Sequence, residues 1–339
     1  MKKILQPKII IPAILSIGLL ASLFAVADVK TVLRIMESFQ HVYLLYFLVA
    51  MVAYEIVRGM QWHYLLESMN IHVPVRTQIF SFAMGEITKS LPIGNYFQNY
   101  VLQQSKGTDF GRSSAATTLI VLNEVAVCLI GVVILGLGTW TVWLRPLIIF
   151  GVLALALAVW TFHKLHHQQR TPEWMTKHEA WRKALDELRQ FRAGVADLLH
   201  PRILIIQFFL GAVYVVIAGS SMYLIARGLG VDKLSYSAVL SVYFFSLAFG
   251  LIFPLPVDVG VTELSGVGAF LAVGLDKNDA VSIMLINRVL SIGAALAIAL
   301  IVMAVLHDEL RAALRSRADP ADQSANRTPS KGSQAAGGC

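Results

Sequence analysis

Long apolar stretches separated by short polar segments make up most of the chain, and six of them predict helices that cross a lipid bilayer. These six cover residues 9–27, 42–57, 113–140, 146–162, 203–226 and 280–306. A hydrocarbon core about 30 Å thick is crossed by about 20 mainly apolar residues in a helix. The pattern therefore predicts an all-α polytopic membrane protein.

Two further apolar stretches, residues 76–104 and 236–275, are interrupted. Proline removes a helix donor and glycine permits sharp turns, so each interruption predicts a break between two half-helices. Irregular backbone is tolerated at membrane depth only where protein or a water-filled cavity satisfies it, and paired interruptions point to a transporter binding site. The break residues are Pro92 and Gly94 in the first stretch and Pro254, Pro256 and Gly260 in the second.

Matching sequence follows the two interruptions. Asn123-Glu124 comes 31 residues after Pro92, and Asn287-Arg288 comes 31 residues after Pro256. The coincidence of break, spacing and buried charge predicts an internal repeat.

Charged segments predict the orientation of the chain, because lysine and arginine collect on the cytoplasmic side of a membrane. Residues 163–202 contain eight Lys/Arg against five Asp/Glu, and further arginines follow the last span. With both termini in the cytoplasm, two re-entrant hairpins would enter from opposite faces, as an inverted repeat requires. Eight full spans give the same end points and are the alternative. Residues 9–27 could also be a signal peptide, but their apolar core is longer than usual and further spans follow.

The polar segment 163–202 has apolar residues at three-, four- or seven-residue steps, which predicts an amphipathic helix on the cytoplasmic leaflet. Its histidines have no carboxylate or cysteine at ligand spacing, so we expect no metal site. Residues 1–306 would form the membrane domain, and residues 307–339 a basic and then disordered cytoplasmic tail.

Composition excludes an ordinary soluble domain, since 56% of the residues are hydrophobic and 14% are charged. The net charge of +7 lies in flanks and loops, a pattern that favours anionic lipid over nucleic acid as a partner. The two cysteines offer no disulfide framework, and no phosphate-binding loop follows a strand. We therefore expect no cofactor and no ATP-driven transport by this chain alone.

Arg288 is the first candidate for a functional residue. It is the only charge in residues 280–306, and a guanidinium inside the hydrocarbon core marks a functional site by default. Its planar fork of donors can bind a lipid phosphate bidentately. The alternative is a structural ion pair with Glu263 or Glu124.

Glu124 is the single charge in residues 113–140, and Asn123 lies beside it. A carboxylate near the middle of the membrane can contact a cationic headgroup or carry a proton, and the alternative is a packing role. Because the sequence predicts no nucleotide site, uphill transport would draw on an ion gradient or the membrane potential.

Five more polar residues near the breaks extend the candidate substrate site. Glu263 is expected to face a cavity, and Asn287 adjoins Arg288. Asp258 either contributes to the site or caps the helix that follows it, with capping favoured. Glu86 and Lys89, at i, i+3 spacing, either bind substrate or pair with each other.

Short motifs occur on both sides of the breaks. They are Gly85-Glu86 ahead of Leu91-Pro92, then Pro254-Leu255-Pro256, Gly260-Val261-Thr262-Glu263, Gly274 and Asn287-Arg288-Val289-Leu290. Over roughly residues 10–306 the chain thereby resembles the lysylphosphatidylglycerol synthase transmembrane-region family of flippase-like proteins. It departs from the family where Val257-Asp258-Val259 replaces a frequent glycine pair. No aminoacyl-transferase domain follows the last span, so the resemblance implies lipid translocation without headgroup synthesis.

We therefore predict a lipid translocase of the bacterial inner membrane rather than an enzyme. The expected substrate is an anionic or aminoacylated phospholipid, a polyprenyl-phosphate-linked lipid or a hopanoid-type lipid. The expected partners are a separate synthase or a second copy of the chain. The alternative is an enzyme or accessory protein that handles a lipid-linked intermediate without moving it. A small-solute exporter would instead have a cavity closed to lipid.

Overall fold

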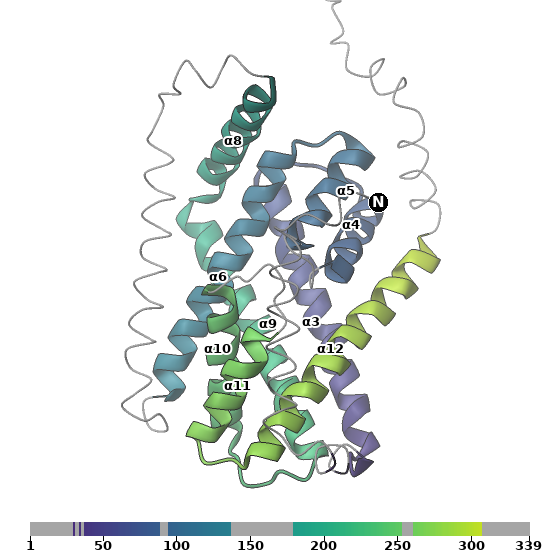
Figure 1. Cartoon of the computed structure of the whole chain (residues 1–339). Helices are drawn as coiled ribbons and strands as arrows, with labels where there is room; N and C mark the ends of the chain where they lie inside the picture. Colours follow the sequence, from purple (N-terminus) through teal and green to yellow (C-terminus); the bar gives the residue numbers. More distant parts are fainter. Residues whose placement is uncertain are drawn as a thin grey trace, which may run out of the picture.

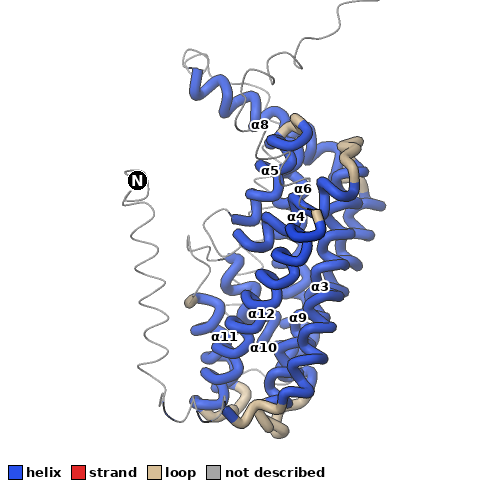
Figure 2. The backbone as a smooth tube through the Cα atoms, turned by 90° about the vertical axis from the view of Figure 1, so that its right-hand side faces the viewer, coloured by secondary structure: helices blue, strands red, loops and turns tan. Residues whose placement is uncertain are grey.

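A computed structural model describes residues 37–88, 94–136, 179–252 and 260–306, together with Lys30 and Arg34 (Figure 1). Every regular element in these residues is a helix, and Figure 2 shows them as an elongated bundle with loops at its two ends. The prediction of an all-α protein is therefore confirmed.

Four long helices are apolar enough to cross a membrane, namely α3 (His41–Ser68), α6 (Phe110–Gly136), α9 (Pro201–Gly228) and α12 (Lys277–Val305). Large apolar side chains stand on their outer surfaces, for example Val49, Phe209 and Ile301, each more than 60% exposed. Such surfaces suit lipid rather than water. These helices match four of the predicted spans, while the predicted spans at 9–27 and 146–162 lie outside the described residues.

The predicted end of the second span near residue 57 is wrong. Helix α3 continues to Ser68 and buries Trp62 beyond that point. Glu55 and Arg58 have the sequence pattern of a polar helix end, yet both side chains are buried inside the bundle. A carboxylate from another helix supplies the partner that makes the burial of Arg58 tolerable, which local sequence does not reveal.

Helices occur on both sides of each predicted break. The first pair is α4 (Val75–Thr88) and α5 (Phe97–Lys106), with the short 3₁₀ turn η1 (Gly94–Tyr96) leading into α5. The second pair is α10 (Tyr236–Ile252) and α11 (Val261–Ala272). In Figure 1 the first pair lies in the upper part of the bundle and the second pair in the lower part. The prolines of both breaks lie outside the described residues.

The two halves of the bundle have the same order of helices. A long helix, two short ones and a second long one measure 28, 14, 10 and 27 residues in the first half. The corresponding lengths in the second half are 28, 17, 12 and 29 residues. The last long helix of each half packs against the first short helix of the other half, so the two halves interlock.

Helices α3 and α9, which begin the two halves, lie side by side and run antiparallel. At one end the Gln40 N–H donates to the Gly228 carbonyl over 2.8 Å. Further along, the Gln61 side-chain amide donates to the Gln207 carbonyl, and the Gln207 amide donates to the Gln61 carbonyl, over 3.4 and 3.3 Å. These reciprocal bonds fix the register between the two helices.

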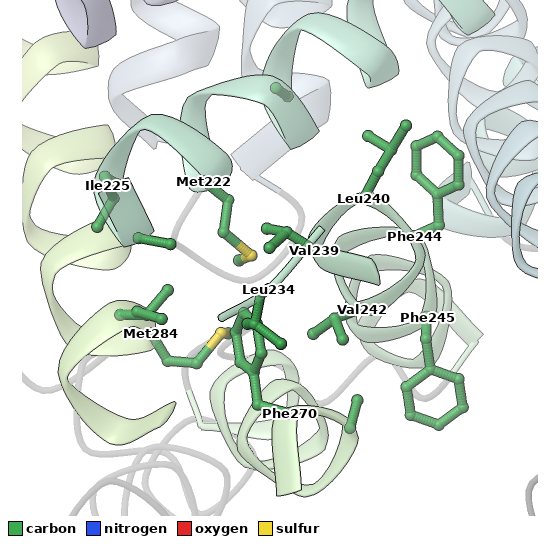
Figure 3. Packing of buried hydrophobic residues seen from close by; sticks show 14 of the residues in the cluster. Met222, Ile225, Leu234, Val239, Leu240, Val242, Phe244, Phe245, Phe270 and Met284 are labelled. Atoms are coloured by element: carbon green, nitrogen blue, oxygen red, sulfur yellow. The ribbon is translucent and has the colours of Figure 1, made fainter. Parts of the chain in front are cut away.

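A continuous apolar core holds the second short pair in place. Figure 3 shows Met222 of α9 and Met284 of α12 pointing toward each other, with Val239 of α10 and Phe270 of α11 beside them. All four side chains are buried. This packing fixes α10 and α11 relative to the long helices and so positions the polar residues at their inner ends.

Helix α8 (Glu179–Leu198) falls within the predicted amphipathic segment. Its apolar residues Leu185 and Leu198 are buried, and the helix packs along α6. The Gly111 N–H at the start of α6 donates to a Glu187 carboxylate oxygen over 2.7 Å, and Arg112 pairs with Asp197 at 2.6 Å. Part of the predicted apolar face is therefore covered by protein, while Leu188 of the same face is 40% exposed.

Candidate functional site

A cavity of about 390 Å³ lies between the long helices α3, α9 and α12 and the inner ends of α4, α10 and α11. We call it the polar cavity because the side chains of Glu55, Glu86, Glu263 and Arg288 line it together with several hydroxyl groups. Glu86 lies near the end of α4, just before the first break, and Glu263 lies near the start of α11, just after the second. Residues next to both breaks therefore meet at one cavity.

Arg288 lies near the middle of α12 and pairs with Glu263 across the polar cavity. The distance between Arg288 Nε and Glu263 Oε1 is 3.3 Å, and the arginine side chain is 21% exposed against 2% for the glutamate. Within the described part of the chain, Arg288 Nε and Nη2 have no hydrogen-bond partner. Two nitrogens of this guanidinium are thus buried with unsatisfied hydrogen-bonding capacity among these residues.

Glu263 is held in place by the start of its own helix. The Gly260 N–H donates to Glu263 Oε2 over 2.6 Å, so the carboxylate caps the helix and contacts Arg288 with its other oxygen. Gly260 has a φ of 107°, a conformation that a residue with a Cβ adopts only with strain. Glu263 performs the capping role that we expected of Asp258, which lies outside the described residues.

A second arginine–glutamate pair, Arg58 with Glu86, was missed by the sequence analysis. Arg58 Nη1 lies 3.1 Å from Glu86 Oε1 and donates to the Tyr54 hydroxyl over 2.7 Å. The guanidinium carbon also lies 5.8 Å from the ring centre of Tyr54 and 6.0 Å from that of Tyr214. Glu86 therefore pairs with an arginine of α3, whereas the predicted alternative partner Lys89 lies outside the described residues. The apolar residues that follow Arg58 continue the helix, and they were the sequence signal that Arg58 lies inside a helix rather than at its end.

Glu124 is buried in α6, with 5% of the residue exposed. It is not among the residues that line the polar cavity. It lies instead within electrostatic range of Arg58, Tyr214 and Tyr243, the last of which does line that cavity. Of the two pairings considered for Arg288, the structure contains the one with Glu263 and not the one with Glu124.

The two asparagines of the predicted repeat have different surroundings. Asn287 lines the polar cavity beside Arg288. The Asn123 amide donates to the Gln207 carbonyl of α9 over 2.8 Å. A Cβ on Gly211 would lie 1.9 Å from the Asn123 amide nitrogen, so the glycine is what lets α6 and α9 approach here. Gly94 accepts a hydrogen bond from the Thr88 hydroxyl over 3.1 Å, which links the two sides of the first break.

An apolar groove of about 370 Å³ adjoins the polar cavity. It lies between α3, α4 and α12 and shares Glu55, Glu86 and Ala295 with the polar cavity. Val52 and Ile56 of α3 line it and are about half exposed, so the groove opens on the outer surface of the bundle. The shared carboxylates mark the boundary between a polar and an apolar compartment.

The side chains that line the polar cavity offer several groups that could bind a ligand. Among the described residues, no group of three histidine, cysteine or carboxylate side chains could hold a metal ion. The polar cavity instead offers guanidinium donors for an anion, carboxylates for a cation or proton, and an adjoining surface for hydrocarbon.

Comparison with known proteins agrees with this architecture. The family model described as the lysylphosphatidylglycerol synthase TM region matches residues 9–315. No curated protein matches the chain. The family match covers most of the chain and includes both breaks, both arginine–glutamate pairs and all four long helices. The chain therefore belongs to the lysylphosphatidylglycerol synthase transmembrane-region family.

Proposed function

We propose that this membrane protein moves a phosphate-bearing lipid between the two leaflets of the bacterial inner membrane. The observation that carries the proposal is the adjacency of the polar cavity and the apolar groove, with volumes of about 390 and 370 Å³. An amphiphile needs both surfaces at once, because its headgroup binds polar groups and its tail must stay in hydrocarbon. A small polar solute has no hydrocarbon tail that would occupy the groove.

The proposed path through the membrane uses the two short helix pairs as opposed re-entrant hairpins of an inverted repeat. The antiparallel contact of α3 with α9 and the matched order of helices support this interpretation. So does the meeting of Glu86 and Glu263 at one cavity.

In this proposal Arg288 binds the lipid phosphate. Its Nε and Nη2 groups have no hydrogen-bond partner among the described residues, and its side chain is 21% exposed beside the polar cavity; both observations support that role. A guanidinium binds phosphate through two parallel hydrogen bonds, and the low dielectric of the membrane interior strengthens them. Glu263 keeps the guanidinium oriented when substrate is absent, and the contact between them breaks when phosphate binds.

The substrate is an anionic or aminoacylated phospholipid or a polyprenyl-phosphate-linked lipid, since a lipid without phosphate would leave Arg288 without its ligand. Both termini lie in the cytoplasm, as the basic segment 163–202 predicts. The cavity carboxylates could instead serve acid–base chemistry on a lipid-linked intermediate, so the function test must separate movement from reaction.

Reconstitution into vesicles tests the proposal. Purified protein is incorporated into phosphatidylglycerol-containing vesicles with a trace of headgroup-labelled lipid, and the fraction of label accessible to a membrane-impermeant quencher is followed in time. The proposal predicts faster exchange between leaflets than in protein-free vesicles, with the lipid chemically unchanged. Exchange at the protein-free rate with every phosphate-bearing lipid tested would contradict it, and a chemically altered lipid would identify an enzyme instead.

A further inference from the structure

Each half of the bundle contains one arginine–glutamate pair, but the two pairs hold different places in the repeat. Arg58 lies on the long helix before its short pair, whereas Arg288 lies on the long helix after its short pair. In each half a glutamate next to a break pairs with an arginine on a long helix, at 3.1 Å for Arg58 and Glu86 and at 3.3 Å for Arg288 and Glu263. Both glutamates line the polar cavity. A single phosphate site would need only one of these arginines.

Arg58 is closed off from the polar cavity by its partner. Glu86 borders the polar cavity, the apolar groove and a third cavity of about 10 Å³, and Arg58 lines only this third one. That volume is about the space one water molecule needs. Glu86 therefore stands between the guanidinium and the space that a headgroup would occupy.

The surroundings of Arg58 keep it in position independently of Glu86. The Tyr54 hydroxyl accepts a hydrogen bond from Arg58 Nη1 over 2.7 Å, and the ring centres of Tyr54 and Tyr214 lie 5.8 and 6.0 Å from the guanidinium carbon. Attraction between a cation and the faces of aromatic rings strengthens when both are shielded from water. If Glu86 moved aside, the guanidinium would remain ordered with its charge exposed to an incoming anion.

We infer that Arg58 is a second anion-binding station, specific for the phosphate group of a lipid and covered by Glu86 in this conformation. The inference rests on the proposed function and extends it. The phosphate binds Arg288 first, because that arginine lines the polar cavity and its side chain is 21% exposed, against 6% for Arg58. Displacement of Glu86 then transfers the phosphate to Arg58, on the helix that begins the other half of the bundle.

A change at Glu86 opens the second station without removing Arg58. Glu86→Gln keeps the size of the side chain and removes the negative charge that competes with phosphate. Native mass spectrometry of the detergent-purified full-length chain counts bound dihexanoyl phosphatidylglycerol as the probe. Wild type should bind one molecule, Glu86→Gln should bind two, and Glu86→Gln/Arg58→Met should bind one again.

Glu67→Gln is the matched control, since it removes a carboxylate that pairs with His72 outside the polar cavity and leaves both arginine–glutamate pairs intact. It should leave the count at one. Thermal unfolding of each variant verifies that the protein is folded, and the pairwise Glu86→Gln/Arg58→Met change avoids leaving an uncompensated buried charge. One bound molecule in folded Glu86→Gln, or two in Glu86→Gln/Arg58→Met, would overturn the second station.

The two proposals fail in different ways. If Glu86→Gln binds one molecule while wild type still exchanges lipid in vesicles, the second station is wrong and translocation stands. If Glu86→Gln binds two molecules while wild type exchanges no lipid, the anion station stands and the translocase is wrong.

Discussion

The two arginine–glutamate pairs differ in how much of their charge is already satisfied. Arg58 has a carboxylate, a hydroxyl and two aromatic rings around it, and its side chain is 6% exposed. Arg288 has one carboxylate at 3.3 Å, two nitrogen atoms without a hydrogen-bond partner in the described residues, and 21% exposure. Breaking a satisfied buried pair destabilises the fold, whereas an incompletely satisfied arginine still has donors that can bind a ligand. The difference indicates which arginine meets the substrate first.

The largest expected effect is on stability, and it separates the two pairs. Arg58→Met should cost about 3–5 kcal/mol in the free energy of unfolding, because it leaves Glu86 charged and buried. Arg288→Met should cost clearly less, since Glu263 keeps its hydrogen bond from the Gly260 N–H. Chemical denaturation of the two variants in the same detergent measures both costs. Equal losses of stability in the two variants would contradict the distinction between the satisfied pair, Arg58 with Glu86, and the incompletely satisfied or open pair, Arg288 with Glu263.

The next largest effect is on transport through Arg288→Lys. Lysine keeps the charge but cannot reproduce the planar fork, so one or two charge-assisted hydrogen bonds to phosphate are lost. Each is worth about 1.5–3 kcal/mol, which corresponds to about a 10- to 100-fold lower leaflet-exchange rate. Arg227→Lys is a matched control, because Arg227 pairs with Asp232 away from the cavity. Comparable loss in both variants would point to general damage.

Filling the apolar groove should lower the leaflet-exchange rate by a smaller, several-fold factor, and the loss should depend on the length of the lipid tail. A Cβ on Gly59, which lines the groove, would lie in ordinary contact with the Phe82 ring at 3.7 Å, so Gly59→Leu can fill the groove without a clash at the backbone. Exchange of long-chain lipid should slow, while short-chain lipid is affected less. Gly293→Leu is the control, because that glycine meets no other group within 4 Å. A groove without a role in tail binding would give equal rates for both variants.

The smallest expected effect concerns energy coupling at Glu124. If uphill transport uses protons, Glu124→Gln should abolish the response of leaflet exchange to an imposed pH gradient and leave the exchange rate without a gradient nearly unchanged. Its buried position near Arg58, behind the cavity wall, favours a proton over a headgroup as its ligand. Vesicles with equal and unequal internal pH provide the measurement. Unchanged responses in both Glu124→Gln and Glu263→Gln would leave downhill flipping as the mechanism.

The sequence predicted those parts of the fold that depend on neighbouring residues in the chain. Apolar length predicted the long helices, and proline with glycine predicted where helices such as α4 and α10 end. The need of Arg288 for a partner also followed, because a lone charge in an apolar helix requires one. The sequence left Glu263 and Glu124 open as that partner, and the structure contains the pair with Glu263.

Residues whose roles depend on distant helices could not be predicted in the same way. Arg58 has the local pattern of a helix end, and its partner Glu86 lies 28 residues away on another helix. Asn123 has the local pattern of a cavity residue, yet the absence of a side chain at Gly211 lets it bond to α9. The apolar groove likewise exists only because α3, α4 and α12 meet.

The most direct test of the account is the leaflet-exchange rate of the double variant Arg288→Met/Glu263→Gln. The change removes both partners of the open pair together, so no uncompensated charge remains and folding should be retained. If Arg288 binds the lipid phosphate, the folded double variant should lose most of its exchange activity in vesicles. If the pair only holds α11 against α12, the double variant should exchange lipid at the wild-type rate, and that result would contradict the phosphate-binding role of Arg288.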